Sequence, residues 1–316
     1  MNIQKPAVSV IMPAYNRAHV IGRAIRSVLA QTFEDFELIV VDDGSTDNAQ
    51  DVVKSFTDTR LIFLRHEQNR GATAARNTGI SASRASYVTF LDSDDEFAPT
   101  KLEEQVSALG NRLGSEDNII VTGLLFFNDG ITSTKKTAPR LILRPCPSGD
   151  IFEVFFAKRN EIFNVTTMIV NRKYLEAVGL FDEKLPASQF WDLGVRLAAK
   201  YKFEVIELPL YIVHRDAGER VWNKDNHFRA FTYLLDKYQR EYSARPKAYA
   251  NAKLRMGVLL LGRGFQREGR QSILKALRLY PYLPNIYIHL LLSLLPSRVG
   301  RLIATKGLKS IIGFNR

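Results

Sequence analysis

The first half of the chain alternates continuous apolar runs with segments whose apolar positions recur at helical spacing. Four apolar runs predict buried strands, at residues 7–12, 37–41, 60–64 and 86–91. Three segments between them predict helices, at residues 17–30, 47–56 and 71–82. Because strand and helix alternate regularly, the pattern predicts an α/β domain with a Rossmann-like, mostly parallel sheet and right-handed crossovers.

The alternation ends after about residue 115. Apolar runs at 118–127 and 162–170 predict two more strands, residues 190–200 a helix, and residues 203–213 an irregular or extended segment. From about residue 226 the pattern is helical. Within it, residues 254–280 resemble one tetratricopeptide-type helix pair with small residues at the packing contacts. Because one such pair cannot bury a core of its own, we expect a helical appendage and not a solenoid.

Charge follows the same division, and we place the domain boundary at residue 225. The chain of 316 residues has a formal net charge of +11. Residues 226–316 contain 17 Lys+Arg against 3 Asp+Glu, whereas residues 1–225 contain 27 against 30. The chain therefore divides into a near-neutral α/β domain, 1–225, and a basic helical C-terminal region, 226–316.

The basic region predicts contact with an anionic membrane surface. It contains the apolar run 283–296, followed by basic residues at intervals, which favours an interfacial helix. No apolar run reaches the roughly 18–20 residues that a spanning helix needs. The alternative is an ordinary helical cap with a solvated basic face. No nucleic-acid recognition motif is visible, so we expect no nucleic-acid partner.

The cysteine content and the N-terminal sequence bear on the cellular location of the protein. Cys146 is the one cysteine of the chain, which fits a reducing compartment. The first residues lack the charged start and apolar core of a signal peptide. Together with the basic region, these features predict a cytoplasmic protein held peripherally at the inner face of the cell membrane.

Acidic side chains follow the fourth predicted strand directly, as Asp92-Ser93-Asp94. Parallel α/β sheets bind ligands at the carboxyl ends of their strands. If the chain stays extended here, Asp92 and Asp94 project to the same side. Two carboxylates on one side suit Mg²⁺ or Mn²⁺. The alternative is an acidic loop that caps the next helix.

Three more polar segments follow strands at the same expected edge of the sheet. They are Pro13-Ala14-Tyr15-Asn16-Arg17, the stretch Asp42-Asp43-Gly44-Ser45-Thr46-Asp47, and the start of the third helix, which contains Arg76. Each segment alone is a weak signal. Four in this order are specific.

On these residues the chain resembles the inverting glycosyltransferases of family 2, which have the GT-A fold. The resemblance covers roughly residues 7–215. Its signatures are Val8–Asn16, Val41–Ser45, Asp92–Asp94, Gly179–Glu183 and Trp191–Leu193. It implies a nucleotide-diphosphate-sugar donor and a divalent metal, Mn²⁺ or Mg²⁺. The acceptor it implies is a glycan or a lipid-linked glycan.

The resemblance also implies roles at the base and ribose end of the donor. Pro13, Ala14 and Tyr15 flank the nucleobase, and Asn16 belongs to the same donor-binding loop. Asp42 or Asp43 accepts a hydrogen bond from a base N–H, which suits uracil or thymine and hence a UDP-sugar. The alternative for these carboxylates is helix capping, and both roles can coexist.

At the phosphate end, the resemblance implies that Arg76 approaches the diphosphate or the base, that Asp92 holds the ribose side, and that Asp94 binds the metal. Ser93 is expected among the donor-binding residues. A solvated helix arginine is the alternative for Arg76. His214 is expected on the metal or the diphosphate, against the alternative of a structural histidine. Asp95 is expected only to support these groups.

The catalytic base departs from the family pattern. An inverting transferase needs a base for the acceptor hydroxyl. The family has an Asp two residues before the Asp of the Trp-Asp-Leu segment. Here Gln189 matches the first member of the pair, but Phe190 stands at the base position and cannot accept a proton.

Three interpretations of Phe190 remain open. A shifted backbone lets Asp192 act as the base, another carboxylate such as Asp95 or Asp182 reaches the site, or the chain is catalytically impaired. For Asp192, an ion pair with Arg196 at i+4 is the favoured alternative.

The sequence thus predicts a metal-dependent glycosyltransferase of the hexosyltransferase type that acts in surface polysaccharide synthesis. A donor-binding but inactive relative, a binding module, is the alternative that Phe190 motivates. A nucleotidyltransferase is disfavoured because the loop after the first strand lacks a glycine-rich, basic sequence.

Overall fold

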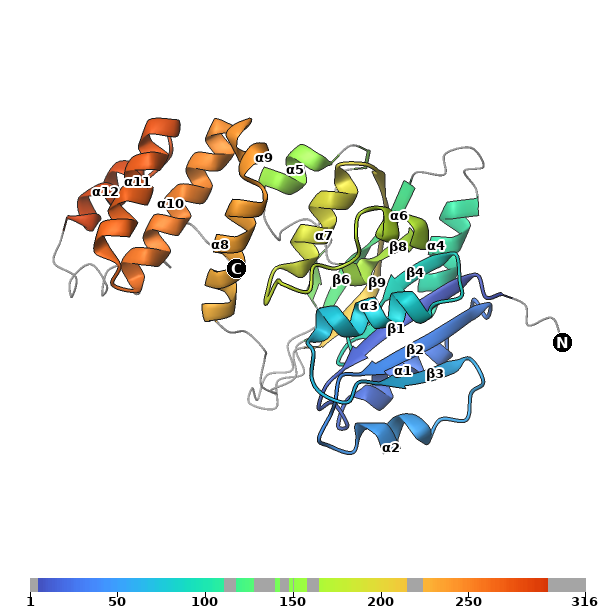
Figure 1. Ribbon diagram of the computed structural model, residues 1–316. Coiled ribbons are helices and arrows are strands. Elements are labelled where there is room, and N and C mark those ends of the chain that lie inside the picture. Colours follow the sequence, from blue (N-terminus) through green and yellow to red (C-terminus); the bar gives the residue numbers. More distant parts are fainter. Residues whose placement is uncertain are drawn as a thin grey trace. The chain divides into compact units, whose positions relative to one another are not determined.

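The structure, a computed structural model, describes residues 5–110, 118–127, 140–142, 148–149, 151–157, 165–214 and 224–294. The chain forms two compact units (Figure 1). The first comprises Met1–Lys184 and Ser188–Val221, and the second Leu185–Ala187 and Trp222–Arg316. The division into domains at residues 225 and 226 stays a prediction.

The first unit is built on a mixed sheet with the strand order β3-β2-β1-β4-β8-β6-β9-β5. The four strands predicted in the first half are present, parallel and adjacent: β1 (Val8–Ala14), β2 (Phe36–Asp42), β3 (Leu61–Arg65) and β4 (Tyr87–Phe90). The second half of the sheet adds β5 (Glu96–Phe97), β6 (Asn118–Phe127), β7 (Arg140–Ile142), β8 (Met168–Asn171) and β9 (Lys202–His214).

The expected strand at 162–170 is largely wrong. Residues 162–164 lie outside the described residues, Val165–Thr167 form a 3-10 turn, and only Met168–Asn171 form a strand. The ladder starts at Met168 because this residue is the first to pair with β6, opposite Val121. The strand then runs antiparallel to both β4 and β6, so the sheet is only partly parallel.

Helices cover both faces of the sheet (Figure 1). The first unit contains α1 (Ile21–Leu29), α2 (Ala49–Lys54), α3 (Ala72–Ala82), α4 (Lys101–Gly110), α5 (Phe152–Ala157), α6 (Arg172–Ala177) and α7 (Gln189–Ala198). Side chains alternate between faces along a strand. Val10 of β1 therefore joins the core beneath α1, while Ile39 of β2 packs with Ala75 of α3 on the other face.

Close packing of α3 on β1 fixes the position of Arg76. Gly79 lies against Ile11 of β1 so closely that a Cβ atom would collide with the isoleucine side chain. Arg76 is one helical turn before Gly79 on the same helix. Its backbone is therefore held at a fixed height above the sheet.

The second unit consists of helices α8 (Lys224–Lys237), α9 (Gln239–Ser243), α10 (Pro246–Gly262), α11 (Gln266–Leu279) and α12 (Ile286–Ser293). The predicted helix pair is confirmed as α10 and α11, with small residues at the contact. Gly257 lies against Ile273, and Gly269 against Leu261. The core of the pair includes Ala250, Leu261, Ile273, Ala276, Leu283 and Ile286.

No helix in the described ranges is long and apolar enough to cross a membrane. The last basic residues of the sequence, Arg298, Arg301, Lys306, Lys309 and Arg316, lie outside the described residues.

Candidate functional site

The polar segments predicted to share one edge of the sheet do so. Ala14 at the end of β1 is paired with Asp42 at the end of β2. The loop after β3 continues the same edge, because the backbone N–H of His66 donates to the Asp42 carbonyl over 2.8 Å. After β4, the N–H of Leu91 donates to the Ile11 carbonyl over 3.0 Å, which leads Asp92 to this edge.

The loops after β1 and β2 are joined to each other. Asn16 has a left-handed backbone (φ 52°), and its N–H donates to Ser45 Oγ over 2.9 Å. In return, the N–H of Thr46 donates to Asn16 Oδ1 over 2.8 Å. Tyr15 remains 42% exposed, whereas Pro13 and Ala14 are buried in β1. Of the residues predicted to flank a base, Tyr15 offers the accessible surface.

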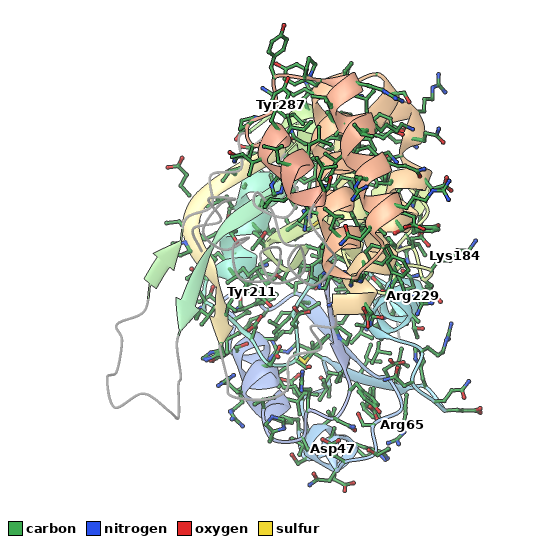
Figure 2. The ribbon with its side chains drawn as sticks, turned by 90° about the vertical axis from the view of Figure 1, so that its left-hand side faces the viewer. Asp47, Arg65, Lys184, Tyr211, Arg229 and Tyr287 are labelled. Carbon is green, nitrogen blue, oxygen red and sulfur yellow. The ribbon has the colours of Figure 1, made fainter. Side chains whose placement is uncertain are left out.

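Asp42 is buried (1% exposed) and holds the loop that follows it. Its Oδ1 accepts a hydrogen bond from the Ser45 N–H over 3.0 Å. Its Oδ2 makes no hydrogen bond to the described residues, although Arg65 Nη1 lies 3.2 Å away as an ion pair. Figure 2 shows Arg65 and Asp47 at the end of the unit that carries these loops. Oδ2 therefore retains acceptor capacity.

Asp43 anchors the segment that leads into α3. One carboxylate oxygen, Oδ1, accepts from the Arg70 N–H (2.9 Å) and lies 2.7 Å from His66 Nδ1. The other, Oδ2, accepts from the Gly71 N–H (2.7 Å). Asp43 therefore holds the loop before α3, and the structure shows no capping of the following helix α2 by Asp43, since the N-cap of α2 is Asn48.

Gly44 is required between these loops. Its φ is +73°, and a Cβ atom would lie 2.7 Å from the backbone carbon of Gln68. Only glycine accepts both the left-handed backbone and the close approach. The Asp-Asp-Gly-Ser sequence is therefore the pattern that this junction needs.

Arg76 and Asp92 form a close ion pair. Arg76 Nη2 donates to Asp92 Oδ1 over 2.6 Å, and the arginine is 4% exposed. Arg76 Nε is buried and has no hydrogen-bond partner among the described residues. A solvated helix arginine is thereby excluded for Arg76.

The chain does not stay extended through Asp92-Ser93-Asp94, so the condition for two carboxylates on one side is not met. The Asp95 N–H donates to the Asp92 carbonyl over 3.1 Å, which closes a turn and sends the two carboxylates in different directions. Asp92 faces Arg76, whereas Asp94 Oδ2 lies 3.9 Å from Arg17 Nη2 and its side chain is 41% exposed. Ser93 is buried at the bend.

Asp95 is the buried member of the acidic run. It accepts hydrogen bonds from the Tyr211 hydroxyl (2.7 Å) and the His214 backbone N–H (2.9 Å). Burial, together with the nearby charges of Asp92 and Asp94, raises the pKa of Asp95 to about 8. Figure 2 labels Tyr211, which lies on β9. Asp95 thus ties the acidic turn to β9.

His214 is brought to the acidic turn by the pairing of β9 with β5. Its Nε2 lies 2.5 Å from Glu96 Oε1, and its backbone contacts Asp95. In this arrangement the imidazole faces a carboxylate that is not part of Asp92-Ser93-Asp94. Metal binding by His214 stays a prediction, and it would require the contact with Glu96 to open.

The donor set fits a divalent ion that arrives with a phosphate ligand. No group of three or more His, Cys, Asp or Glu side chains is arranged to hold a metal in the described ranges. Asp94 offers an accessible carboxylate, and Asp92 lies two residues away. Mg²⁺ is typically bound by one or two carboxylates, with substrate phosphates and water as further ligands. Asp94 fits that pattern.

Phe190 lies against Arg76. Helix α7 begins at Gln189, and the Arg76 guanidinium carbon sits 4.7 Å from the centroid of the Phe190 ring. Gln189 and Phe190 are both half-buried. Phe181 packs edge-on to Phe190, with ring centroids 6.4 Å apart, and lies 5.8 Å from the same guanidinium. The position expected for the base therefore carries an aromatic ring in contact with Arg76.

Asp192 is occupied by an ion pair. It is fully buried, and its Oδ2 accepts from Arg196 Nη2 (2.7 Å) and Nε (3.0 Å). This is the i+4 pair that was the favoured alternative. The geometry gives Asp192 no route to the site edge without breaking that pair.

Asn77 contributes a support that sequence reasoning missed. Its side-chain amide exchanges two hydrogen bonds of 3.0 Å with the Phe181 backbone and donates to Glu183 Oε1 over 2.9 Å. The turn that it holds has positive φ at Gly179 (83°) and Leu180 (57°). The Gly-Leu-Phe-Asp-Glu signature marked the turn, but Asn77 is distant in sequence and gave no signal.

Comparison with known proteins identifies the family of the chain. The family model described as "Glycosyl transferase family 2" matches residues 9–178. A protein named as an uncharacterized glycosyltransferase in Rickettsia felis is 34% identical over 230 residues, which covers 72% of this chain. This chain spans 37% of that relative's length.

Two relatives from Escherichia coli have more specific names. WcaA, named as a colanic acid biosynthesis glycosyl transferase, is 28% identical over 77% of this chain and 85% of its own length. WfgD, named as a UDP-Glc:alpha-D-GlcNAc-diphosphoundecaprenol beta-1,3-glucosyltransferase, is 45% identical over 32% of this chain and 40% of its own.

A solved structure establishes the fold. Residues 1–349 of S. aureus TarS, crystallised with UDP-GlcNAc, superpose with a TM-score of 0.59 at 16% identity. The superposition covers 95% of this chain and 92% of that one. The expected GT-A fold, with helices added at the C-terminus, is thereby confirmed.

Proposed function

This chain belongs to glycosyl transferase family 2, and we propose that it is a metal-dependent inverting glycosyltransferase of the hexosyltransferase type. Its donor is a nucleotide-diphosphate sugar, a UDP-sugar. Its acceptor is a glycan or a lipid-linked glycan in surface polysaccharide synthesis. The buried Arg76–Asp92 pair at the carboxyl edge of the sheet is the observation that carries this proposal.

Donor binding follows from the chemistry of that edge. Tyr15 offers an exposed ring for a base, and Asp42 Oδ2 retains capacity to accept a base N–H. Arg76 Nε is a buried donor without a partner among the described residues, and an oxygen of the nucleotide would satisfy it. The names of two relatives support this donor and acceptor class. WfgD is named for a UDP-Glc donor and a GlcNAc-diphosphoundecaprenol acceptor, and WcaA for colanic acid biosynthesis.

In the transfer, the acceptor oxygen attacks the anomeric carbon and loses its proton to a base. The bond from the anomeric carbon to the diphosphate breaks, and the nucleoside diphosphate leaves. Asp94 would hold the divalent metal. That ion supplies charge stabilisation to the departing diphosphate when bound. Arg17, 3.9 Å from Asp94, adds positive charge at the same end of the site.

Phe190 favours a second candidate function, that of a donor-binding relative with impaired transfer. The ring occupies the base position and contacts Arg76, while Asp192 is held by Arg196. In this alternative the site binds the nucleotide sugar, and no carboxylate on α7 removes the acceptor proton. The two candidates share donor binding and differ in turnover.

Turnover separates the candidates. The full chain is supplied with Mn²⁺, a panel of nucleotide sugars and lipid-linked or free glycans, and release of the nucleoside diphosphate is measured. The transferase candidate predicts release that depends on both metal and acceptor. Donor binding without release supports the impaired relative, and absence of both binding and release contradicts the proposal.

The variant Phe190→Asp places a carboxylate where the family has its base. We expect kcat to rise, because an acceptor proton gains a base, and KM for the donor to rise with it, because the new carboxylate competes with Asp92 for Arg76. A fully active parent with no gain in kcat on substitution would mean that another group already serves as the base.

We further propose that the C-terminal region attaches the protein to an anionic membrane surface at the inner face of the cell membrane. Helix α12 buries Ile286 and leaves Tyr287 and Leu291 56% and 66% exposed, and its C-cap residue Leu294 is 60% exposed. Figure 2 shows the Tyr287 side chain projecting from the helices. An apolar face on a strongly basic unit fits an anionic bilayer.

Sedimentation with liposomes containing an anionic lipid tests this attachment. The double variant Leu291→Ser/Leu294→Ser should lose most of the bound fraction. Leu208→Ser, which changes a 42% exposed leucine on β9, is the matched control and should bind as the parent does. Equal binding of all three proteins would rule out α12 as the attachment.

A further inference from the structure

Arg76 is a buried arginine whose hydrogen-bond donors are only partly paired. Its guanidinium is buried (4% exposed), and Asp92 is the carboxylate paired with it, through Nη2. Nε is buried without a hydrogen-bond partner among the described residues. A buried charge with open donors is costly unless something else stabilises it.

Two aromatic rings supply that stabilisation. The guanidinium carbon lies 4.7 Å from the Phe190 centroid and 5.8 Å from the Phe181 centroid, both within the range of a cation–π contact. A ring face attracts the cation without accepting its N–H groups in the way a carboxylate does. The Nε donor of Arg76 is therefore left without a hydrogen-bond partner among the described residues.

We infer that Phe190 is a positioning residue that holds the Arg76 guanidinium in place for a hydrogen-bond acceptor oxygen of the bound nucleotide. The role explains why a residue that cannot take a proton stands at the base position. It rests on the proposed donor binding, because the ligand of Arg76 is taken to be the nucleotide.

The rings are themselves held in place. Phe181 is buried, its backbone is fixed by Asn77, and its ring packs edge-on against Phe90, with centroids 5.4 Å apart. Phe190 packs against this fixed ring near the start of α7. Phe190, which is half-buried, therefore contacts the Arg76 guanidinium from the more exposed side. The buried Phe181 supports the Phe190 ring.

A cycle of variants tests the inference, with UDP and Mn²⁺ as the probe and calorimetry as the readout. Phe190→Leu keeps the apolar volume but removes the ring face. Its Kd for UDP should rise about 5- to 30-fold, the factor that corresponds to about 1–2 kcal/mol for a desolvated cation–π contact. Phe190→Tyr keeps the ring and should restore most of the affinity.

Two further variants separate positioning from general destabilisation. In an Arg76→Gln background, Phe190→Leu should change the Kd less than twofold, since the ring acts through the guanidinium. Phe152→Leu removes a ring of the same unit that stacks on Phe156 instead, with centroids 5.7 Å apart. It should leave the Kd unchanged.

A second readout does not depend on nucleotide binding. The melting temperature is measured for the parent, Phe190→Leu, Arg76→Gln and the double variant. If the ring and the guanidinium interact, the sum of the decreases in melting temperature of the two single variants exceeds the decrease of the double variant. Additive decreases overturn the inference, and so does an unchanged Kd in a folded Phe190→Leu protein. If the parent binds no UDP, the proposed function fails and with it the nucleotide as the ligand of Arg76, whereas the melting cycle still decides whether Phe190 holds the guanidinium.

Discussion

At the level of single residues, the three carboxylates of the acidic turn Asp92–Asp95 have different surroundings. Asp92 neutralises Arg76, Asp94 stays accessible beside Arg17, and Asp95 is buried behind them. Three neighbouring carboxylates thereby have three environments, because the turn closed by Asp95 separates their directions. Accessible charge suits ligand binding, and the buried carboxyl group is the one whose protonation responds to the fold.

Asp95 should make the stability of the metal-free protein depend on pH. The pKa is about 8 in the folded state, because of burial and then the charges of Asp92 and Asp94, and about 3.9 in an unfolded chain. The folded state therefore binds the proton more tightly. Its stabilising contribution is complete below about pH 4 and is lost as pH rises through about 8.

The free energy of unfolding, measured by denaturation in EDTA, should fall with pH across this window by at most about 1.4 kcal/mol per unit from this group. Asp95→Asn cannot titrate, so the difference between parent and variant isolates the contribution. Parallel pH profiles for the two proteins would show that Asp95 titrates normally.

The site residues themselves could be chosen from sequence, but their partners could not. Four polar segments after predicted strands indicated Asp92, Arg76 and Asp42 as one group, because parallel strands share an edge. The ion pair Arg76–Asp92, the Asn77 support and the contact with Phe190 join segments up to about a hundred residues apart. No local pattern in the sequence encodes such contacts.

Packing at the scale of elements depends on glycine where helices come close. Helices α10 and α11 approach through Gly257 and Gly269. A Cβ atom on Gly257 would lie 2.6 Å from Ile273 Cγ1 and 2.8 Å from the Gly269 carbonyl oxygen. Because one of these atoms is backbone, the helices would have to move apart.

Gly257→Ala should therefore destabilise the helical unit by about 1–3 kcal/mol, the usual cost of overpacking. Gly262→Ala is the matched control on the same helix, where a Cβ atom meets nothing within 4 Å. It should be neutral or slightly stabilising. Chemical denaturation followed by circular dichroism measures both. A Gly257→Ala protein as stable as Gly262→Ala would contradict the close contact.

Helices and strands that depend on local sequence patterns were predictable, whereas those that depend on contacts between distant segments were not. β1 to β4 and α1 to α3 follow from their periodicity, and the helix pair follows from its small residues. β8 was expected to be longer than it is, because an apolar run does not show which residues find a partner strand. Antiparallel pairing with β4 and β6 joins distant segments and left no trace in the spacing.

The whole molecule combines a near-neutral α/β unit with a strongly basic helical one, a difference that composition alone revealed. The α/β unit carries every described residue that we assign to donor binding. The helical unit carries the apolar α12 face that we assign to membrane attachment. Donor binding and membrane attachment should accordingly be separable by substitution, which keeps the two proposals independent.

The central claim is that the carboxyl edge of the sheet binds a nucleotide diphosphate together with a divalent metal. Calorimetric titration of the full chain with UDP and Mn²⁺ tests it most directly, in the parent, in Asp94→Asn and in the control Asp51→Asn, an exposed residue of α2. We predict one UDP site per chain, at least tenfold weaker in Asp94→Asn or in EDTA and unchanged in Asp51→Asn. A parent that binds no UDP, or an Asp94→Asn protein that binds it equally well, would contradict the account.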